Sequence, residues 1–168
     1  MSTISDLLQS HWALPALLSA PVLLVWLYLC IWGPSTFRRK LSGRNARNWP
    51  GVIFLGKGIA RPAAVYAQEA YEAQHKLNPI NLFLVMFSRS AKRRMEYMGH
   101  EIEVQVCARL YSQTAHDARM REAETMQRGY SGLFRRMTVP QIYEAMADRS
   151  GDARDWVDAH IEQIRGYK

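Results

Sequence analysis

Charge is missing from the first part of this 168-residue chain. No ionised side chain lies between Asp6 and Arg38, and no acidic one lies between Asp6 and Glu69. Cysteine is scarce as well, because Cys30 and Cys107 are the only two, and this excludes a small domain held together by disulfides. The length suits one domain with an appendage and excludes a multidomain protein.

Common catalytic motifs are also missing. Gly56-Lys57-Gly58 lacks the flanking pattern of a phosphate-binding loop, and we interpret it as a turn. His100 and His116, with Ser112 or Cys107 nearby in the sequence, do not give a nucleophile, a base and an orienting group at a recognisable spacing. The sequence therefore offers no nucleotide-binding loop and no nucleophilic triad.

The excess of basic charge is confined to one short segment. The whole net charge of +7 is carried by seven residues with no acidic residue among them: Arg38, Arg39, Lys40, Arg44, Arg47, Lys57 and Arg61. The other 15 of the 22 basic residues are balanced by 15 acidic ones. Basic charge concentrated in this way beside an apolar run indicates contact with anionic lipid headgroups, which we expect for these seven residues.

The charge-free stretch at 13–33 is long enough to cross a membrane. A hydrocarbon core about 30 Å thick requires roughly 20 helical residues. A cleaved signal peptide would need basic residues before the apolar run, and residues 1–12 contain none. A core helix would have to bury its whole circumference inside a domain too small to surround it. We therefore expect a single transmembrane helix.

The basic residues that follow this stretch predict its orientation. Basic residues favour the cytoplasmic side of a membrane. We therefore expect a short outer N-terminus at 1–12, a transmembrane helix at 13–33, a basic juxtamembrane linker at 34–62 and a helical domain at 63–168. The domain would face the cytoplasm, or the interior of a virion membrane.

Apolar periodicity and helix-forming composition predict a mainly α fold after residue 62. We expect helices at 63–76, 88–113 and 117–134, from Thr138 to about Arg149, and at 153–165. Thr138 and Gln141 match a capping box, and Asp152 is placed to cap the last helix. Val52–Leu55 forms either a short strand or an apolar contact, and no large sheet is expected.

The segment Ile80–Phe87 is apolar on every side but too short to span a bilayer. It is either the buried start of the next helix or a segment that dips into a membrane interface, and we favour burial.

Candidate metal ligands lie on the first two helices of the expected domain. Glu69, Glu72 and His75 are three residues apart, and Glu96, His100 and Glu103 are four and three apart. Each trio would lie along one helical face, so the two faces could converge. Carboxylates and imidazole bind zinc or iron, and Glu72-x-x-His75 has the spacing found in di-iron helical bundles. The alternative, which we favour, is an ordinary solvated helix face.

The same region carries a family resemblance. The segment Gln68-Glu69-Ala70-Tyr71-Glu72 and Gln74, with Arg93-Arg94-Met95-Glu96 about twenty residues later, resembles the layout of small phage and prophage proteins of zinc-peptidase type. The resemblance extends from Tyr66 to Gln105 and implies a helical scaffold. It assigns Glu69 to the general base and Glu96 or Glu101 to a downstream metal ligand. Gln68 and Glu72 occupy the positions of the two zinc-binding histidines, so the motif is degenerate.

Three functions follow from these observations. We expect a single-pass, non-catalytic structural or assembly component without a cofactor, of phage or virion type, whose domain binds a protein partner or further copies of itself at the membrane. The first alternative is a membrane-tethered metallohydrolase that uses Glu69, Glu72, His75, Glu96 and His100 with zinc or iron. The second is a membrane-anchored protein that binds nucleic acid through residues 38–61, where affinity would fall steeply with salt.

Overall fold

The computed structural model describes residues 23–24, 35–36 and 46–168. The chain divides into two units, Met1–Gly33 and Pro34–Lys168. In the first unit the described residues are Leu23 and Leu24, which are helical and exposed. Apart from these two, the expected transmembrane helix lies outside the described residues. Within the described ranges, no helix combines the length and the apolar character needed to cross a membrane.

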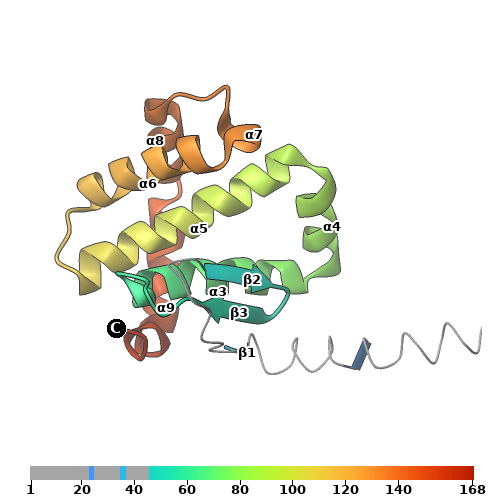
Figure 1. The fold of residues 1–168 in the computed structure, drawn as a ribbon, viewed down its shortest axis with the longest axis horizontal. Coiled ribbons are helices and arrows are strands. Elements are labelled where there is room, and N and C mark those ends of the chain that lie inside the picture. The colour runs from blue at the N-terminus through green and yellow to red at the C-terminus, as the bar shows by residue number, and fades with distance from the viewer. Residues whose placement is uncertain (1–22, 25–34, 37–45) are drawn as a thin grey trace, which may run out of the picture. The chain divides into compact units, whose positions relative to one another are not determined.

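The second unit is mainly helical, which confirms the mainly α part of the predicted fold class. Its helices are α3 (Pro62–Leu77), α4 (Pro79–Phe87), α5 (Arg89–Leu110), α6 (Ala115–Gly129), α7 (Ser131–Phe134), α8 (Val139–Ala147) and α9 (Ser150–Arg165). The long helix α5 is central and packs against α3, α4, α6, α8 and α9 (Figure 1). Ile102 and Val106 of α5 are fully buried together with Met126, Ile142 and Ile164 from the surrounding helices.

The ends of several helices follow from their local sequence. The capping box predicted at Thr138 and Gln141 is present at the start of α8. The expected cap at Asp152 is absent, because α9 begins two residues earlier, at Ser150, and Asp152 lies in its first turn. The break between the last two helices therefore lies at Asp148 and Arg149, and Ser150 and Gly151, where the composition predicts it, belong to α9.

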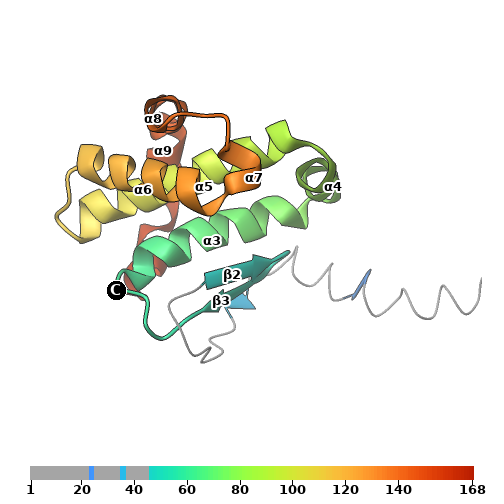
Figure 2. The same cartoon turned by 45° about the horizontal axis from the view of Figure 1, so that its top comes forward.

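Part of the segment assigned to a linker belongs to the folded unit. Strands β1 (Ser35–Thr36), β2 (Ala46–Trp49) and β3 (Val52–Leu55) form a small sheet in the order β1-β3-β2. β2 and β3 form an antiparallel hairpin along α3 (Figure 2). Its turn contains Gly51 with φ 71°, a left-handed conformation that favours glycine. The amide of Gly51 donates a hydrogen bond to the carbonyl of Ala73, 3.2 Å away, which joins the turn to α3.

The expected burial of Ile80–Phe87 is wrong. These residues form the separate helix α4, in which Val85 is the single buried residue. Ser88 has an extended backbone and caps the start of α5, where its Oγ accepts a hydrogen bond from the amide of Ala91. This break separates α4 from α5 and leaves most of the apolar surface of α4 exposed.

Candidate metal centre

Helix α3 presents a buried polar face to the interior of the domain. Gln68, Glu69 and Glu72 are each less than a tenth exposed. The side-chain amide of Asn48 in β2 donates hydrogen bonds to Glu69 and to Glu72 Oε2, the second over 3.0 Å. Lys76 Nζ lies 3.1 Å from the same oxygen of Glu72 and 2.6 Å from Asn48 Oδ1. The hairpin therefore holds the two carboxylates of α3 in place.

Helix α5 presents a matching polar face to α3. Glu96, His100 and Glu103 are buried, so the expectation of an ordinary solvated face is wrong for them. Gly99 explains the close packing, because a Cβ at this position would lie 3.2 Å from both Gln68 Cγ and Glu72 Oε1. The face remains buried because α3 and α6 cover it.

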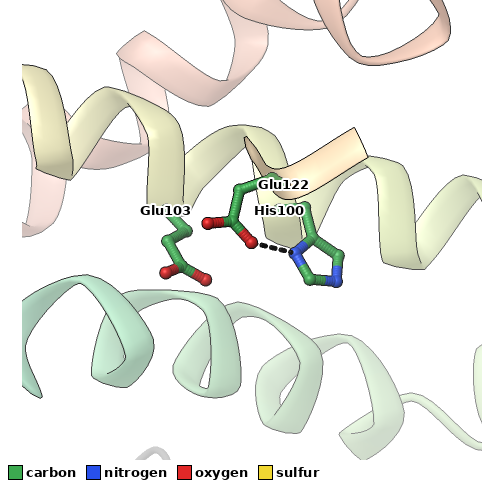
Figure 3. A group of neighbouring side chains, drawn as sticks. All are labelled: His100, Glu103 and Glu122. Atoms are coloured by element: carbon green, nitrogen blue, oxygen red, sulfur yellow. Dashed lines mark hydrogen bonds and ion pairs between the residues drawn. The ribbon is translucent and has the colours of Figure 1, made fainter. Parts of the chain in front are cut away.

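A third helix completes the cluster. Glu122 of α6 places its Oε2 3.3 Å from His100 Nδ1 (Figure 3). His100, Glu103 and Glu122 each offer one ligand atom, and these three atoms lie within 4.8 Å of one another. All three side chains are buried. One imidazole and two carboxylates from two helices therefore form a group that can hold a metal ion.

Three buried carboxyl groups have pKa values close to neutral pH. Burial raises the pKa of Glu69, Glu96 and Glu103 from 4.5 to about 7. Neighbouring carboxylates add to the rise: Glu72 acts on Glu69 and Glu96, and Glu122 acts on Glu103. Groups that titrate near neutral pH are suited to proton transfer or to the exchange of a proton for a cation.

The pKa of His100 is raised, although burial usually lowers the pKa of a histidine. Burial alone lowers it, but the hydrogen bond with Glu122 and the charges of Glu122, Glu103 and Glu96 outweigh burial and raise the pKa to about 9. Burial raises the pKa of Glu122, and the hydrogen bond and charge of His100 reverse this, so its pKa is lowered. Without a metal, the two side chains form a buried ion pair at neutral pH.

One carboxylate oxygen beside the cluster has no hydrogen-bond partner among the described residues. Glu96 is 4% exposed, and its Oε2 is the one buried side-chain oxygen or nitrogen without a hydrogen bond among the described residues. The charges of Glu72 and His100 both act on this group, which places it beside the cluster. An unsatisfied buried polar atom is costly, so a water or a bound group that donated a hydrogen bond to this oxygen would be stabilising.

A cavity of about 490 Å³ gives access to the cluster. Its acidic and imidazole lining consists of Glu69, His100, Glu103 and Glu122. Three arginines line the same cavity: Arg47, Arg61 and Arg121. Arg61 and Arg121 both donate hydrogen bonds to Gln113 Oε1, so these two guanidinium groups lie close together. The cavity thus combines a negative cluster with a positive wall.

The structure brings together most of the ligands considered from the sequence. Glu69, Glu72, Glu96 and His100 belong to the same polar region. His75 does not, since it lines a separate cavity with Tyr71 and Arg149. The Glu72-x-x-His75 pair therefore does not act as one chelating unit.

Glu101 also lies apart from the cluster. It is fully buried and accepts hydrogen bonds from Arg119 Nε and from Gln105, at 2.7 and 2.8 Å. Of the two candidates for a downstream ligand, Glu96 is therefore the one beside His100.

The residues assigned to membrane contact differ in their surroundings. Arg38, Arg39, Lys40 and Arg44 lie outside the described residues. Arg47 and Lys57 are exposed. Arg61 is half-buried and contacts Cys107 Sγ and Gln113 inside the folded unit, so it is not free to follow a lipid surface.

Sequence reasoning missed Glu122 and Asn48. Glu122 lies four residues from Ala118 and from Met126, both buried, and this spacing is a signal that it faces the interior. Asn48 carries no such signal, because its contacts with Glu69 and Glu72 connect residues 21 and 24 positions apart.

Comparison of the chain with protein-family models, curated proteins and solved structures finds no match.

Proposed function

We propose that the helical domain is a metal-dependent hydrolase in which His100, Glu103 and Glu122 bind one divalent cation. The observation that carries this proposal is the convergence of their three ligand atoms within 4.8 Å at a cavity. Ligands about 2.1 Å from a tetrahedral metal lie about 3.4 Å apart. The 3.3 Å between His100 Nδ1 and Glu122 Oε2 already suits such a site.

The donor set indicates the class of metal. One nitrogen and two carboxylate oxygens favour Zn²⁺, Fe²⁺ or Mn²⁺ over softer ions that prefer thiolates. Three protein ligands leave at least one coordination position for water, as catalytic sites require. The side-chain amide of Gln68 lies 3.5 Å from Nε2 of His100. With a metal on Nδ1, the Nε2–H group donates, and the amide turned by 180° would accept this hydrogen bond through its oxygen and fix the orientation of the ring. This role would account for glutamine at a position where the zinc-peptidase resemblance implies a ligand.

Glu69 is the proposed general base. It lines the same cavity as the three ligands, and its pKa of about 7 suits a group that accepts and returns a proton near neutral pH. In the proposed reaction, the water oxygen forms a bond to the electrophilic centre of the substrate while its proton passes to Glu69. The bond to the leaving group then breaks, and the proton passes to that group. Arg47, Arg61 and Arg121 favour a substrate with an anionic group.

The sequence supports a membrane location for this activity. The charge-free run at 13–33 and the basic residues after it are the basis for a single N-terminal transmembrane anchor, with its N-terminus outside and the helical domain in the cytoplasm. The anchor would restrict the enzyme to substrates close to the bilayer.

Metal analysis of the full-length protein tests the proposal. After dialysis against Zn²⁺, Fe²⁺ or Mn²⁺, we expect one tightly held ion per chain. The double variant Glu103→Gln/Glu122→Gln should lower the affinity about 100-fold or more, because amides replace two anionic ligands. Glu124→Gln is the matched control, since this residue lies on the same helix but is exposed and forms its one ion pair among the described residues with Arg128. Absence of stoichiometric metal, or equal affinity in the double variant, would contradict the proposal.

The role of Glu69 has a separate test. In Glu69→Gln the metal should be retained, while hydrolysis of a library of acidic peptides should fall by about 100-fold or more, in the range expected for loss of a general base. Glu162→Gln, on an exposed site of α9, should leave hydrolysis unchanged. Loss of metal together with activity in Glu69→Gln would instead assign Glu69 a structural role.

A non-catalytic scaffold is the second candidate, and one observation favours it. Several of the buried polar groups in and beside the cluster already have protein partners: His100 pairs with Glu122, and Glu72 with Lys76. Such a network can fix the packing of three helices without a metal. In this case the membrane-anchored domain would act as a structural or assembly component, of the phage or virion type, that docks a protein. This candidate would be favoured if the protein binds no metal and if adding Zn²⁺, Fe²⁺ or Mn²⁺ leaves its stability unchanged.

A further inference from the structure

Helix α4 exposes an apolar surface that has no partner in the described part of the chain. Five of its nine residues are large, apolar and between 42% and 72% exposed: Ile80, Phe83, Leu84, Met86 and Phe87. The helix lies at the end of the bundle where α3 ends and α5 begins (Figure 1). Large apolar side chains exposed together on one helix are typical of sites of interaction.

The helix is well formed despite this exposure. Asn78 Oδ1 accepts a hydrogen bond from the amide of Ile80 at 2.9 Å, and the amide of Ser88 donates to the carbonyl of Leu84 at 2.8 Å. Val85 is buried and attaches the helix to the domain. The apolar side chains are therefore presented on a fixed element.

Positive charge surrounds the same end of the bundle. No acidic residue lies between Glu72 and Glu96 in the sequence. The basic residues that follow α4 are Arg89, Lys92, Arg93 and Arg94. Across from them, Arg135 and Arg136 follow α7 and are exposed. Among residues 46–168, no carboxylate forms an ion pair with any of these six side chains.

Four of these arginines line one groove. The groove has a volume of about 850 Å³ and is formed by Arg89, Arg93, Arg135 and Arg136 together with Gly132 and Leu133. Arg93 Nε donates a hydrogen bond of 2.8 Å to the carbonyl of Leu133, which connects α5 to α7 across the groove. The other three guanidinium groups remain available for an anion.

We infer that this end of the domain docks on an anionic lipid bilayer, with α4 inserted among the acyl chains and the arginine groove bound to headgroup phosphates. Exposed aromatic and aliphatic side chains beside unpaired basic ones are the combination that interfacial helices use. Nucleic acid would account for the arginines but not for Phe83, Met86 and Phe87. The inference does not depend on a metal or on the segment 13–33.

A depth-sensitive probe on the full chain tests this docking. In a Cys30→Ser background, where Cys107 is buried, an environment-sensitive fluorophore is attached at Phe87→Cys. The protein is reconstituted in phosphatidylcholine vesicles with or without phosphatidylglycerol. With the anionic lipid, we expect the emission to shift to the blue and to be quenched several-fold more by spin-labelled acyl chains than by aqueous iodide. A probe at Glu144→Cys, exposed on α8, should show the opposite preference.

Reversing the charge of two arginines in the groove distinguishes docking of this end of the domain from tethering by the N-terminal segment alone. Arg135→Glu/Arg136→Glu should abolish the quenching by acyl chains at position 87, whereas the matched control Arg154→Glu/Lys168→Glu, exposed in and after α9, should retain it. Three outcomes would overturn the inference: continued access of iodide to position 87 in anionic vesicles, equal insertion in the charge-reversed protein, or protection by RNA or by a second copy of the chain rather than by lipid.

Discussion

Replacing Arg119 by methionine is expected to lower the free energy of unfolding by about 3–5 kcal/mol, the range for breaking a buried ion pair. Glu101 is fully buried, and Arg119 binds both of its oxygens, over 2.7 Å from Nε and 2.6 Å from the second terminal nitrogen. Without the guanidinium, the Glu101 carboxylate would remain in the core with Gln105 as its one hydrogen-bond donor among the described residues. Denaturant unfolding of the full chain, followed by its helical signal, measures the change.

Two further variants test whether the loss of stability comes from the unpaired Glu101 carboxylate. The double variant Arg119→Met/Glu101→Gln should recover much of the lost stability, because no unpaired charge is left. Arg109→Met breaks an ion pair with Asp158 that is exposed, so its effect should be much smaller. Equal effects of Arg119→Met and Arg109→Met would show that the Glu101 pair is not important for stability.

The metal-free protein is expected to lose stability as the pH rises from about 4.5 to about 9. The folded-state pKa values of Glu69, Glu96 and Glu103 are about 7 instead of 4.5, so the folded state binds more protons than the unfolded state between these values. His100, at about 9 instead of 6.5, contributes stability that is complete below pH 6.5 and lost as the pH rises to about 9. Each pKa unit corresponds to about 1.4 kcal/mol, and coupling among the groups limits the total to a few kcal/mol.

A bound metal should reverse this trend. A cation must displace the proton of His100, so its affinity should rise about tenfold per pH unit between pH 7 and 9. Unfolding measured at pH 5, 7 and 9, with a chelator and then with the ion, compares the two states. Glu103→Gln should reduce the slope between pH 5 and 7 in the metal-free protein, whereas the exposed Glu124→Gln should not. A metal-free protein that gains stability towards pH 9 would contradict the assigned pKa directions.

The helices could be predicted from the sequence because the information that forms them is local. The apolar spacing in 88–113 and the capping box at Thr138 involve residues three or four positions apart, and α5 and α8 follow them closely. The glycine of the β2–β3 turn is likewise a local requirement. By contrast, the composition around Ser150 predicted a later start for α9, because serine and glycine favour a break only weakly and can also occupy the first turn of a helix.

The candidate site could be predicted only in part. The spacing of Glu96, His100 and Glu103 placed them on one face, but charged side chains on a helix are usually exposed, and only the cover by α3 and α6 makes these buried. Glu122 and Asn48 come from separate elements and meet the cluster through packing.

The sequence by itself determined most of the helical segments, the cap at Thr138 and which residues share a helical face, because neighbours on one helix are fixed by its period. The tertiary structure alone decided that the carboxylates of α3, α5 and α6 lie together away from water, and that the apolar α4 faces outward. Burial depends on which other elements cover a surface, and this is set by long-range packing rather than by the residues on that surface.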